Sequence, residues 1–406
     1  MPNKVITNKN LIDEVLNKGV EKIYPSPDAL RKVLSSGKRL RVYCGYDPTA
    51  PSLHIGHAIT LRKLSQFQKL GHEVIMLIGD FTAMIGDPTD KTATRKRLSR
   101  KEVLKNLKDY KKQAAKILNF TGKNPAKIKY NSKWHSKITF DKLIELAANF
   151  TVQQMIVRDM FQERIKKDKP IYLHEFLYPL AQAYDSVAMN VDLEVGGNDQ
   201  TFNMLCGRDL MKSLKNKEKF VLTTKLLVDP TGKKMGKTEG NVVNLNDAPK
   251  DMYGKIMSWP DSLILPGFEL CTDFSIKEIK EIELELKNKK TNPRDLKAVL
   301  AREIVSIHHS KKAAIEAERE FNRIFKEKSL PSKMPYYKSK LTKASILDLL
   351  IEAKLTSSKS EAKRLVEQGA VRINNRVINS WRQKIKIQSG MVLQVGKRRF
   401  LRIVKK

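Results

Sequence analysis

One stretch of the chain decides the fold: residues 40–80 read LRVYCGYDPTAPSLHIGHAITLRKLSQFQKLGHEVIMLIGD. The apolar run at 40–44 is typical of a buried strand, and the glycine-containing turn after it leads into a helical pattern over 54–70. Gly71 is a typical helix stop, and the apolar run at 74–78 indicates a second buried strand. Strand, turn, helix and strand in this order form one βαβ unit of a parallel α/β sheet.

A polar turn follows each of the two predicted strands. The first turn reads Gly45-Tyr46-Asp47-Pro48-Thr49, and the second reads Gly86-Asp87-Pro88. Ligands of an open parallel sheet bind beyond the carboxyl ends of its strands. We therefore expect both turns to border one binding site.

The sheet belongs to a predicted Rossmann-type domain over residues 1–245. Helical periodicity dominates its middle part, which predicts a helical insertion at about 110–190. A polar segment that is rich in glycine and lysine, residues 231–241, should form a mobile loop.

The remainder of the chain predicts two further domains. Residues 246–328 have a helical period and indicate an all-α domain. Residues 329–341 carry two prolines and few apolar side chains, as a linker does. Residues 342–406 combine two helical stretches with alternating segments, so a small α+β domain is expected there.

The charge of the protein is strongly unbalanced. Lys and Arg number 78 against 44 Asp and Glu, a net charge of +34, and such an excess attracts polyanions, nucleic acid first among them. Residues 341–406 hold 16 basic and 4 acidic side chains, so more than a third of the excess lies in the last predicted domain. The alternative, a lysine-rich bias of the whole proteome, stays open on charge alone.

Cysteine usage and hydropathy bear on the compartment. The three cysteines, Cys44, Cys206 and Cys271, have no metal-ligand spacing, and their odd number argues against a disulfide framework. No stretch approaches the roughly 20 apolar residues of a membrane span, and the N-terminus has no apolar signal-peptide core. These features predict a soluble, cytoplasmic protein without a membrane partner.

The sequence HIGH at 54–57 is the first candidate site. His54 and His57 share one face of the predicted helix, in its first turn, where free backbone N–H groups and the helix dipole favour anions. Gly56 would let a nucleotide approach the backbone closely. The pattern indicates a triphosphate site. The alternative is a structural pair of histidines; a metal site would need another ligand nearby, and we expect none.

The predicted loop at 231–241 is the second candidate site and reads TGKKMGKTEGN. Its lysines could reach phosphates as mobile point charges. The spacing is not that of a P-loop, and solvated lysine-rich loops are common. Alone, this cluster leaves both interpretations open.

The two clusters together are more specific than either alone. HIGH at 54–57 and KMGKT at 234–238 resemble the paired signatures of the class I aminoacyl-tRNA synthetases. The second signature departs from the usual KMSKS at Gly236 and Thr238, but both of its lysines remain.

A third cluster, YPLAQAYD at 178–185, resembles the tyrosine-pocket helix of the tyrosyl-tRNA synthetases. Tyr178, Gln182 and Asp185 fall on one helix face. The resemblance implies that Asp185 and Tyr43 bind the phenolic hydroxyl of the substrate. It also implies that Tyr178, Gln182 and Asp87 surround the substrate ammonium group. The alternative is a structural helix with a buried aromatic edge and polar caps.

The same resemblance assigns two further groups of residues. The positions expected to contact ATP or the adenylate are Gly45, Asp47, Thr49, Gly56, Thr60, Gly197, Asp199 and Gln200. The positions expected to cancel charge on the phosphates are His54, His57, Lys234 and Lys237, assisted by Thr238, Lys91 and Arg95.

The resemblance also implies an activity and partners. It implies a ligase that activates L-tyrosine with ATP and Mg²⁺, releases pyrophosphate and transfers tyrosine to the 3′ end of tRNA(Tyr). It further implies a homodimer through the insertion and an all-α domain that faces the anticodon. Segments 344–350 and 358–371 resemble an S4 RNA-binding domain, which would grip the tRNA backbone. The alternative for this domain is a basic helix pair without a ligand.

Two other functions stay open. A tryptophanyl enzyme shares the fold, but Asp185 and Tyr43 suit a phenolic hydroxyl, which an indole lacks. The other is a catalytically inactive paralogue that acts as an RNA-binding or splicing factor. The histidines and lysines of both signatures are intact, which argues against that paralogue.

Overall fold

The computed structural model describes residues 4–89, 97–229, 231–232, 235, 242–288, 291–325, 334–339, 342–396 and 399–405. The chain forms two compact units, Met1–Glu318 and Arg319–Lys406. Of the helices in these described ranges, none is both long enough and apolar enough to cross a membrane.

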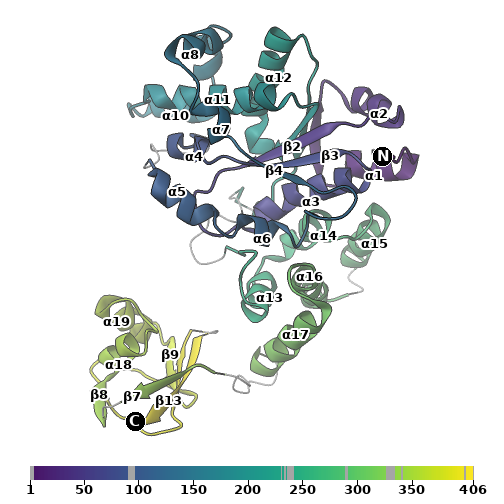
Figure 1. Ribbon diagram of the computed structural model, residues 1–406. Coiled ribbons are helices and arrows are strands. Elements are labelled where there is room, and N and C mark those ends of the chain that lie inside the picture. The colour runs from purple at the N-terminus through teal and green to yellow at the C-terminus, as the bar shows by residue number, and fades with distance from the viewer. Residues whose placement is uncertain are drawn as a thin grey trace. The chain divides into compact units, whose positions relative to one another are not determined.

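The first unit is built around a six-stranded sheet in the order β1-β6-β5-β2-β3-β4 (Figure 1). Its strands are β1 (Val20–Tyr24), β2 (Arg41–Tyr46), β3 (Glu73–Ile78), β4 (Lys127–Tyr130), β5 (Leu193–Gly197) and β6 (Phe220–Thr224). Neighbouring strands are parallel except β1 with β6. β3 reads EVIMLI and is buried after its first residue, as expected for a parallel strand covered on both faces. The predicted parallel α/β fold is thus confirmed.

Helices cover both faces of this sheet (Figure 1). On one side α11 (Leu173–Met189) packs against α12 (Thr201–Lys215), and on the other side α3 (Ile55–Lys69) packs against β2 and β3. The remaining helices before β6 are α1 (Lys9–Asn17), α2 (Pro27–Ser35), α4 (Thr82–Ile85), α5 (Arg100–Leu107), α6 (Tyr110–Ala114), α7 (Ser132–His135), α8 (Phe140–Ala147), α9 (Val152–Ile156) and α10 (Asp159–Lys166).

The prediction of a purely helical insertion at 110–190 was wrong in one part. β4 lies inside it, runs parallel to β3 and forms one edge of the sheet. Its four residues, KIKY, are too few to show a period, so periodicity could not identify the strand. The insertion contains only helices from α7 onward.

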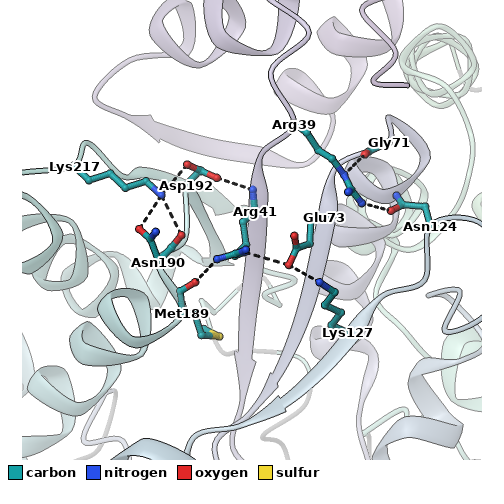
Figure 2. A network of polar contacts seen from close by, with 10 residues as sticks. All are labelled: Arg39, Arg41, Gly71, Glu73, Asn124, Lys127, Met189, Asn190, Asp192 and Lys217. Atoms are coloured by element: carbon teal, nitrogen blue, oxygen red, sulfur yellow. Dashed lines mark hydrogen bonds and ion pairs between the residues drawn. The ribbon is translucent and has the colours of Figure 1, made fainter. Parts of the chain in front are cut away.

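A polar network ties the amino ends of the central strands together (Figure 2). Arg41 on β2 and Lys127 on β4 both donate to Glu73 Oε1 on β3, at 3.1 and 3.0 Å. The backbone N–H of Arg41 donates to Asp192 Oδ2 at 2.7 Å, and Lys217 forms an ion pair with the same carboxylate. The network fixes the mutual register of the strands, which then determines what stands at their carboxyl ends.

The described residues between 249 and 325 form helices joined by short loops, as their period predicted, and those up to Glu318 lie in the first compact unit and not in a unit of their own. The helices are α13 (Pro249–Met257), α14 (Ile264–Cys271), α15 (Ile276–Lys287), α16 (Pro293–His308) and α17 (Lys311–Phe325). Trp259 and Phe268 are buried among α13, α14 and α16, so these helices have a well-packed interior.

The second unit is an α+β structure with its own core. Its main sheet has the order β10-β9-β12-β13-β7, and β11 pairs with β8. The elements are β7 (Tyr336–Ser339), β8 (Lys343–Ser345), α18 (Ile346–Glu352), α19 (Lys359–Glu367), β9 (Val371–Ile373), β10 (Arg376–Val377), β11 (Lys384–Lys386), β12 (Val392–Val395) and β13 (Arg399–Lys405). β7 pairs in parallel with β13, so the prediction of a linker over 329–341 was wrong for residues 336–339. Leu349, Leu350 and Val366 pack against the sheet residue Leu393 in the core.

Candidate active site

A cavity of about 410 Å³ opens at the carboxyl ends of β2, β3 and β5. Its lining includes every predicted site residue that the structure describes: Tyr43, Gly45, Asp47, Thr49, His54, Gly56, His57, Thr60, Asp87, Tyr178, Gln182, Asp185, Gly197, Asp199 and Gln200. The predicted residues Lys91, Arg95, Lys234, Lys237 and Thr238 lie outside the described residues. Four separated segments of sequence therefore converge on one cavity.

The two histidines of the first signature form the start of α3. His54 is its N-cap, and its Nδ1 accepts a hydrogen bond from the Gly56 backbone N–H at 3.1 Å. His57 Nδ1 accepts from the backbone N–H of His54 at 3.1 Å, and the centroids of the two imidazole rings are 3.8 Å apart. Because Nδ1 accepts in both rings, each neutral imidazole carries its proton on Nε2. Burial, together with the neighbouring His54, holds the pKa of His57 well below 6.5, so its imidazole is neutral at pH 7.

The expectation of free backbone N–H groups at this helix start was wrong. The N–H groups of Ile55, Gly56 and His57 are all bonded, to Val243 O, His54 Nδ1 and His54 O respectively. The structure also gives a reason for glycine at position 56 besides the expected close approach of a nucleotide. A Cβ on Gly56 would stand 2.9 Å from Cε1 of His54, so glycine is needed for the histidine ring.

Thr60 supports this helix start from within. Its hydroxyl donates to the His57 carbonyl at 3.1 Å. The phenolic hydroxyl of Tyr46 lies 2.9 Å from the same Thr60 oxygen and is therefore the donor in that contact. The proton of Thr60 is thus used inside the protein, which leaves its oxygen to act as an acceptor.

Asp47 follows β2 directly and joins the two halves of the site. Thr82 donates to its Oδ1 at 2.7 Å, and the Tyr178 hydroxyl donates to its Oδ2 at 2.9 Å. Desolvation raises the pKa of Asp47 to about 7 although both hydrogen bonds favour the carboxylate. Tyr178, which the sequence assigned to the ammonium group, therefore also holds a residue assigned to the nucleotide.

Asp87 and Gln200 meet across the cavity. Thr89 donates to Asp87 Oδ1 through its backbone N–H at 2.9 Å and through its hydroxyl at 2.6 Å. Gln200 Nε2 donates to Asp87 Oδ2 at 2.8 Å. The turn after β3 and the turn after β5 are thereby fixed to each other, although more than a hundred residues separate them.

Asp185 on α11 is buried among donors that sequence reasoning missed. Trp134 Nε1 and His135 Nε2 both reach its Oδ1 at 2.7 Å, and Asn131 Nδ2 donates to its Oδ2 at 3.3 Å. Burial raises the pKa of Asp185, and these contacts oppose that rise. The missed residues follow β4, so recognition of that strand would have placed them at the binding edge of the sheet.

The side chain of Tyr43 on β2 contacts a second group of buried polar residues, which the sequence analysis did not predict. Its hydroxyl lies 2.8 Å from Ser186 Oγ on α11, and Ser186 contacts the ion pair of Lys219 with Glu194. Gln182 Nε2 donates to the other oxygen of Glu194 at 3.0 Å. Glu194 is a charged residue inside the otherwise apolar strand LEVGG, and this feature of the sequence could have indicated a buried ion pair here.

Comparisons with known families agree with this geometry. Residues 35–326 match the family described as tRNA synthetases class I (W and Y). Residues 326–403 match the family described as the tyrosine–tRNA ligase SYY-like C-terminal domain. Both matches meet at residue 326, and together they account for nearly the whole chain.

Proteins similar to this chain over nearly its whole length are named tyrosine–tRNA ligases. A tyrosine–tRNA ligase of Carboxydothermus hydrogenoformans is 47% identical, with 96% of this chain and 97% of that protein covered. A tyrosine–tRNA ligase of Haemophilus influenzae is 43% identical, with 98% of both covered.

Solved structures show the same fold over about three quarters of the chain. A C-terminally truncated mitochondrial tyrosyl-tRNA synthetase of Coccidioides posadasii gives a TM-score of 0.63 at 25% identity, covering 77% of this chain and 92% of that one. A tyrosyl-tRNA synthetase of Archaeoglobus fulgidus, complexed with L-tyrosine, gives 0.60 at 21% identity, covering 76% and 99%. The family matches and the relatives at 43% and 47% identity mean that the chain belongs to the class I aminoacyl-tRNA synthetases, in the family of the tyrosine–tRNA ligases.

Proposed function

We propose that the cavity at the carboxyl ends of β2, β3 and β5 is where this tyrosine–tRNA ligase binds tyrosine and ATP together. The observation that carries the proposal is the pairing of a buried carboxylate, Asp185, with a buried phenol, Tyr43, in one cavity lining. Two buried polar groups that face a cavity favour a ligand that can hydrogen-bond to both.

Asp185 is proposed to accept the phenolic proton of tyrosine. A carboxylate can accept about four hydrogen bonds, and three donors reach Asp185 within the described part of the chain. It therefore retains capacity for one more donor. Phenylalanine would leave Asp185 and Tyr43 without that partner, which is costly in a buried site. Rejection of phenylalanine by this logic is already the standard example for this enzyme class.

The ammonium group of tyrosine is proposed to lie near Tyr178, Gln182 and Asp87. Gln182 donates its amide N–H to Glu194, so its carbonyl oxygen is oriented as an acceptor. The hydroxyl of Tyr178 donates to Asp47, and its oxygen can accept from an ammonium. The carboxylate of Asp87 supplies the opposite charge.

The nucleotide is proposed to occupy the side of the cavity at α3. His54 and His57, with protons on Nε2, would donate to phosphate oxygens, and the remaining contacts are proposed for Gly45, Asp47, Thr49, Gly56, Thr60, Gly197, Asp199 and Gln200. From the family resemblance alone we assign charge cancellation also to Lys234, Lys237 and Thr238 of the second signature and to Lys91 and Arg95, which follow Gly86-Asp87-Pro88. No covalent nucleophile is needed, because the tyrosine carboxylate attacks the α-phosphorus and pyrophosphate leaves. The terminal hydroxyl of tRNA then attacks the adenylate carbonyl and releases AMP.

Mg²⁺ is proposed to accompany ATP as the complex of its phosphates. Within the described ranges no group of three or more His, Cys, Asp or Glu side chains could hold a metal ion. Mg²⁺ needs few protein ligands when phosphates supply most of its oxygens, so the proposal requires no dedicated metal site in the protein. The ion would offset negative charge on the leaving pyrophosphate.

The two later segments are proposed to bind tRNA. The S4-like domain at 342–406 carries 16 basic against 4 acidic side chains and would contact the tRNA backbone, and the helical domain at 246–328 would face the anticodon. Of the predicted linker at 329–341, residues 329–333 lie outside the described residues and stay a proposal, whereas the Pro335 carbonyl already accepts a hydrogen bond from the backbone of Arg402 in β13. The free, buried cysteines support a reducing, cytoplasmic location.

A homodimer through the insertion is also proposed. Seven large apolar side chains are exposed between α8 and the start of α11: Phe140, Ile144, Val152, Val157, Ile165, Tyr172 and Leu173. Phe140 and Leu173 are 77% and 79% exposed, and several large, exposed apolar side chains within one segment are typical of an interaction surface. A second copy of the chain is the proposed cover, because the family resemblance places a dimer interface in this insertion.

The assignment of the tyrosine pocket can be tested by equilibrium binding. Titration calorimetry would compare tyrosine and phenylalanine on the unaltered enzyme, Asp185→Asn and Tyr43→Phe, with the exposed Asp209→Asn on α12 as the matched control. We expect each pocket variant to weaken tyrosine binding about tenfold or more, as for the loss of one buried hydrogen bond. Unchanged tyrosine affinity in both variants would contradict the assignment.

A further inference from the structure

A buried cation lies directly behind the proposed tyrosine pocket. Lys219, just before β6, has an exposed fraction of 0%. Its Nζ donates to Ser186 Oγ on α11 at 2.9 Å and to the Met204 carbonyl on α12 at 3.1 Å, and it forms an ion pair with Glu194 on β5. The hydroxyl of Tyr43 is 2.8 Å from the same Ser186 oxygen. Lys219 is thus two hydrogen bonds away from the substrate side of Tyr43.

The hydrogen count fixes the direction of the first bond. An ammonium has three N–H donors and cannot accept. Lys219 uses them on Ser186, Met204 and Glu194. Ser186 Oγ therefore accepts from Lys219 and has a single proton of its own to give.

Two acceptors compete for the proton of Ser186. Tyr43 Oη lies at 2.8 Å and Glu194 Oε2 at 3.5 Å, which is at the outer limit for a hydrogen bond. Glu194 Oε2 is also already the ion-pair partner of Lys219. The shorter contact favours donation of this proton to Tyr43, and the hydroxyl proton of Tyr43 then points away from Ser186, toward the cavity that Tyr43 lines.

We propose that Lys219 is a positioning residue for tyrosine selection, because its donation to Ser186 orders the Tyr43 hydroxyl as a donor to the phenolic oxygen of the substrate. This inference rests on the proposed function, in which Tyr43 and Asp185 share the phenolic hydroxyl. The two roles are complementary. Asp185 can only accept the phenolic proton, so the phenolic oxygen needs a donor, and the ordered Tyr43 supplies one. Phenylalanine has no phenolic oxygen, so the ordered Tyr43 hydroxyl does not strengthen its binding.

The packing of α12 is adapted to this group. Gly207 lies inside α12, where glycine is unfavourable for a helix. A Cβ at this position would stand 2.5 Å from Lys219 Nζ and 2.9 Å from Ser186 Oγ. The glycine therefore makes room for the two polar groups of the chain Lys219–Ser186–Tyr43.

The inference is tested by pyrophosphate-exchange kinetics with tyrosine and with phenylalanine. Ser186→Ala breaks the chain in its middle and keeps the ion pair. Lys219→Met combined with Glu194→Gln removes both charges, so neither is left buried alone, and Gln at 194 can still accept from Gln182. For both variants we expect kcat/KM for tyrosine to fall about tenfold, mainly through KM. The value for phenylalanine should stay within about twofold, so the tyrosine-to-phenylalanine ratio falls about tenfold.

Two controls separate positioning from damage to the fold. Arg208→Met combined with Glu218→Gln removes a neighbouring ion pair between α12 and the residues just before β6. Neither residue lines the cavity, so the ratio should stay unchanged. In a double-mutant cycle, Ser186→Ala added to Tyr43→Phe should lower the ratio no further, because Ser186 acts through the Tyr43 hydroxyl.

The outcomes distinguish the inference from the proposed function. An equal loss with tyrosine and phenylalanine would assign Lys219 and Ser186 a structural role only and overturn the inference. So would an unchanged ratio in Ser186→Ala while Tyr43→Phe lowers it. If Tyr43→Phe itself leaves the ratio unchanged, the tyrosine pocket is wrongly assigned, and the proposed function fails with it.

Discussion

His57 Nδ1 accepts the backbone N–H of His54, while His54 Nδ1 accepts the backbone N–H of Gly56, so the two histidines cap one helix together. This arrangement fixes the tautomer of both rings and makes each a donor through Nε2. Burial keeps the pKa of His57 well below 6.5, so its imidazole is neutral at the pH of the reaction. The signature therefore supplies oriented neutral donors to the phosphates, and its cations must come from elsewhere.

His57→Ala should lower kcat of pyrophosphate exchange about 100-fold, because one preorganised donor to the transition state is lost. The KM for tyrosine should change little, since His57 does not belong to the tyrosine pocket. Steady-state exchange kinetics measure both values. His174→Ala at the start of α11 is the matched control, and a similar loss in that variant would contradict a specific role for His57.

Asp47→Asn should change how stability depends on pH. The pKa of Asp47 is raised from 3.8 to about 7, so between these values the folded state binds a proton that the unfolded state lacks. This contribution to stability is present at low pH and is lost as pH rises through about 7. We expect the Tm of Asp47→Asn, relative to the unaltered enzyme, to rise between pH 5 and pH 9. A constant difference in Tm over this pH range would contradict the raised pKa.

Leu173→Lys combined with Phe140→Lys should convert a dimer into a monomer. Both side chains are largely exposed on the insertion, and two buried charges at an apolar interface are strongly unfavourable. Sedimentation velocity would measure the mass. Leu284→Lys on α15, also an exposed leucine, is the control that should stay dimeric. If the unaltered enzyme itself sediments as a monomer, the dimer proposal is wrong.

Ending the chain at Phe325 should separate activation from transfer. The cut lies before β7, because β7 is a strand of the second unit and would otherwise be left without its partner β13. Exchange with tyrosine should stay within about twofold, whereas tRNA charging should fall about 100-fold or more, because phosphate contacts dominate nucleic-acid affinity. Loss of both activities to the same extent, from folded protein, would refute this division of labour.

Long apolar runs made the central fold predictable from sequence. β2, α3 and β3 were recognisable because strand and helix periods alternate within one stretch and a glycine marks the helix end. β4 was not recognisable, because its register with β3 is set by tertiary pairing and its four residues show no period.

The candidate site was predictable as a set of residues but not as a set of contacts. The signatures identified His54 and Asp185, yet the partners of Asp185 lie about fifty residues earlier in the chain and emerge only when β4 joins the sheet. Gly56 was assigned to the nucleotide, whereas the nearest group is the ring of His54. Contacts of this kind depend on side-chain direction, which spacing alone does not give.

The most direct test of the account is pyrophosphate exchange with each of the twenty amino acids, in the presence of ATP and Mg²⁺ and without tRNA. We expect exchange with tyrosine alone, because only its phenolic hydroxyl satisfies both Tyr43 and Asp185. Exchange with phenylalanine at a comparable rate, or no exchange with tyrosine from folded protein, would contradict the proposed cavity chemistry.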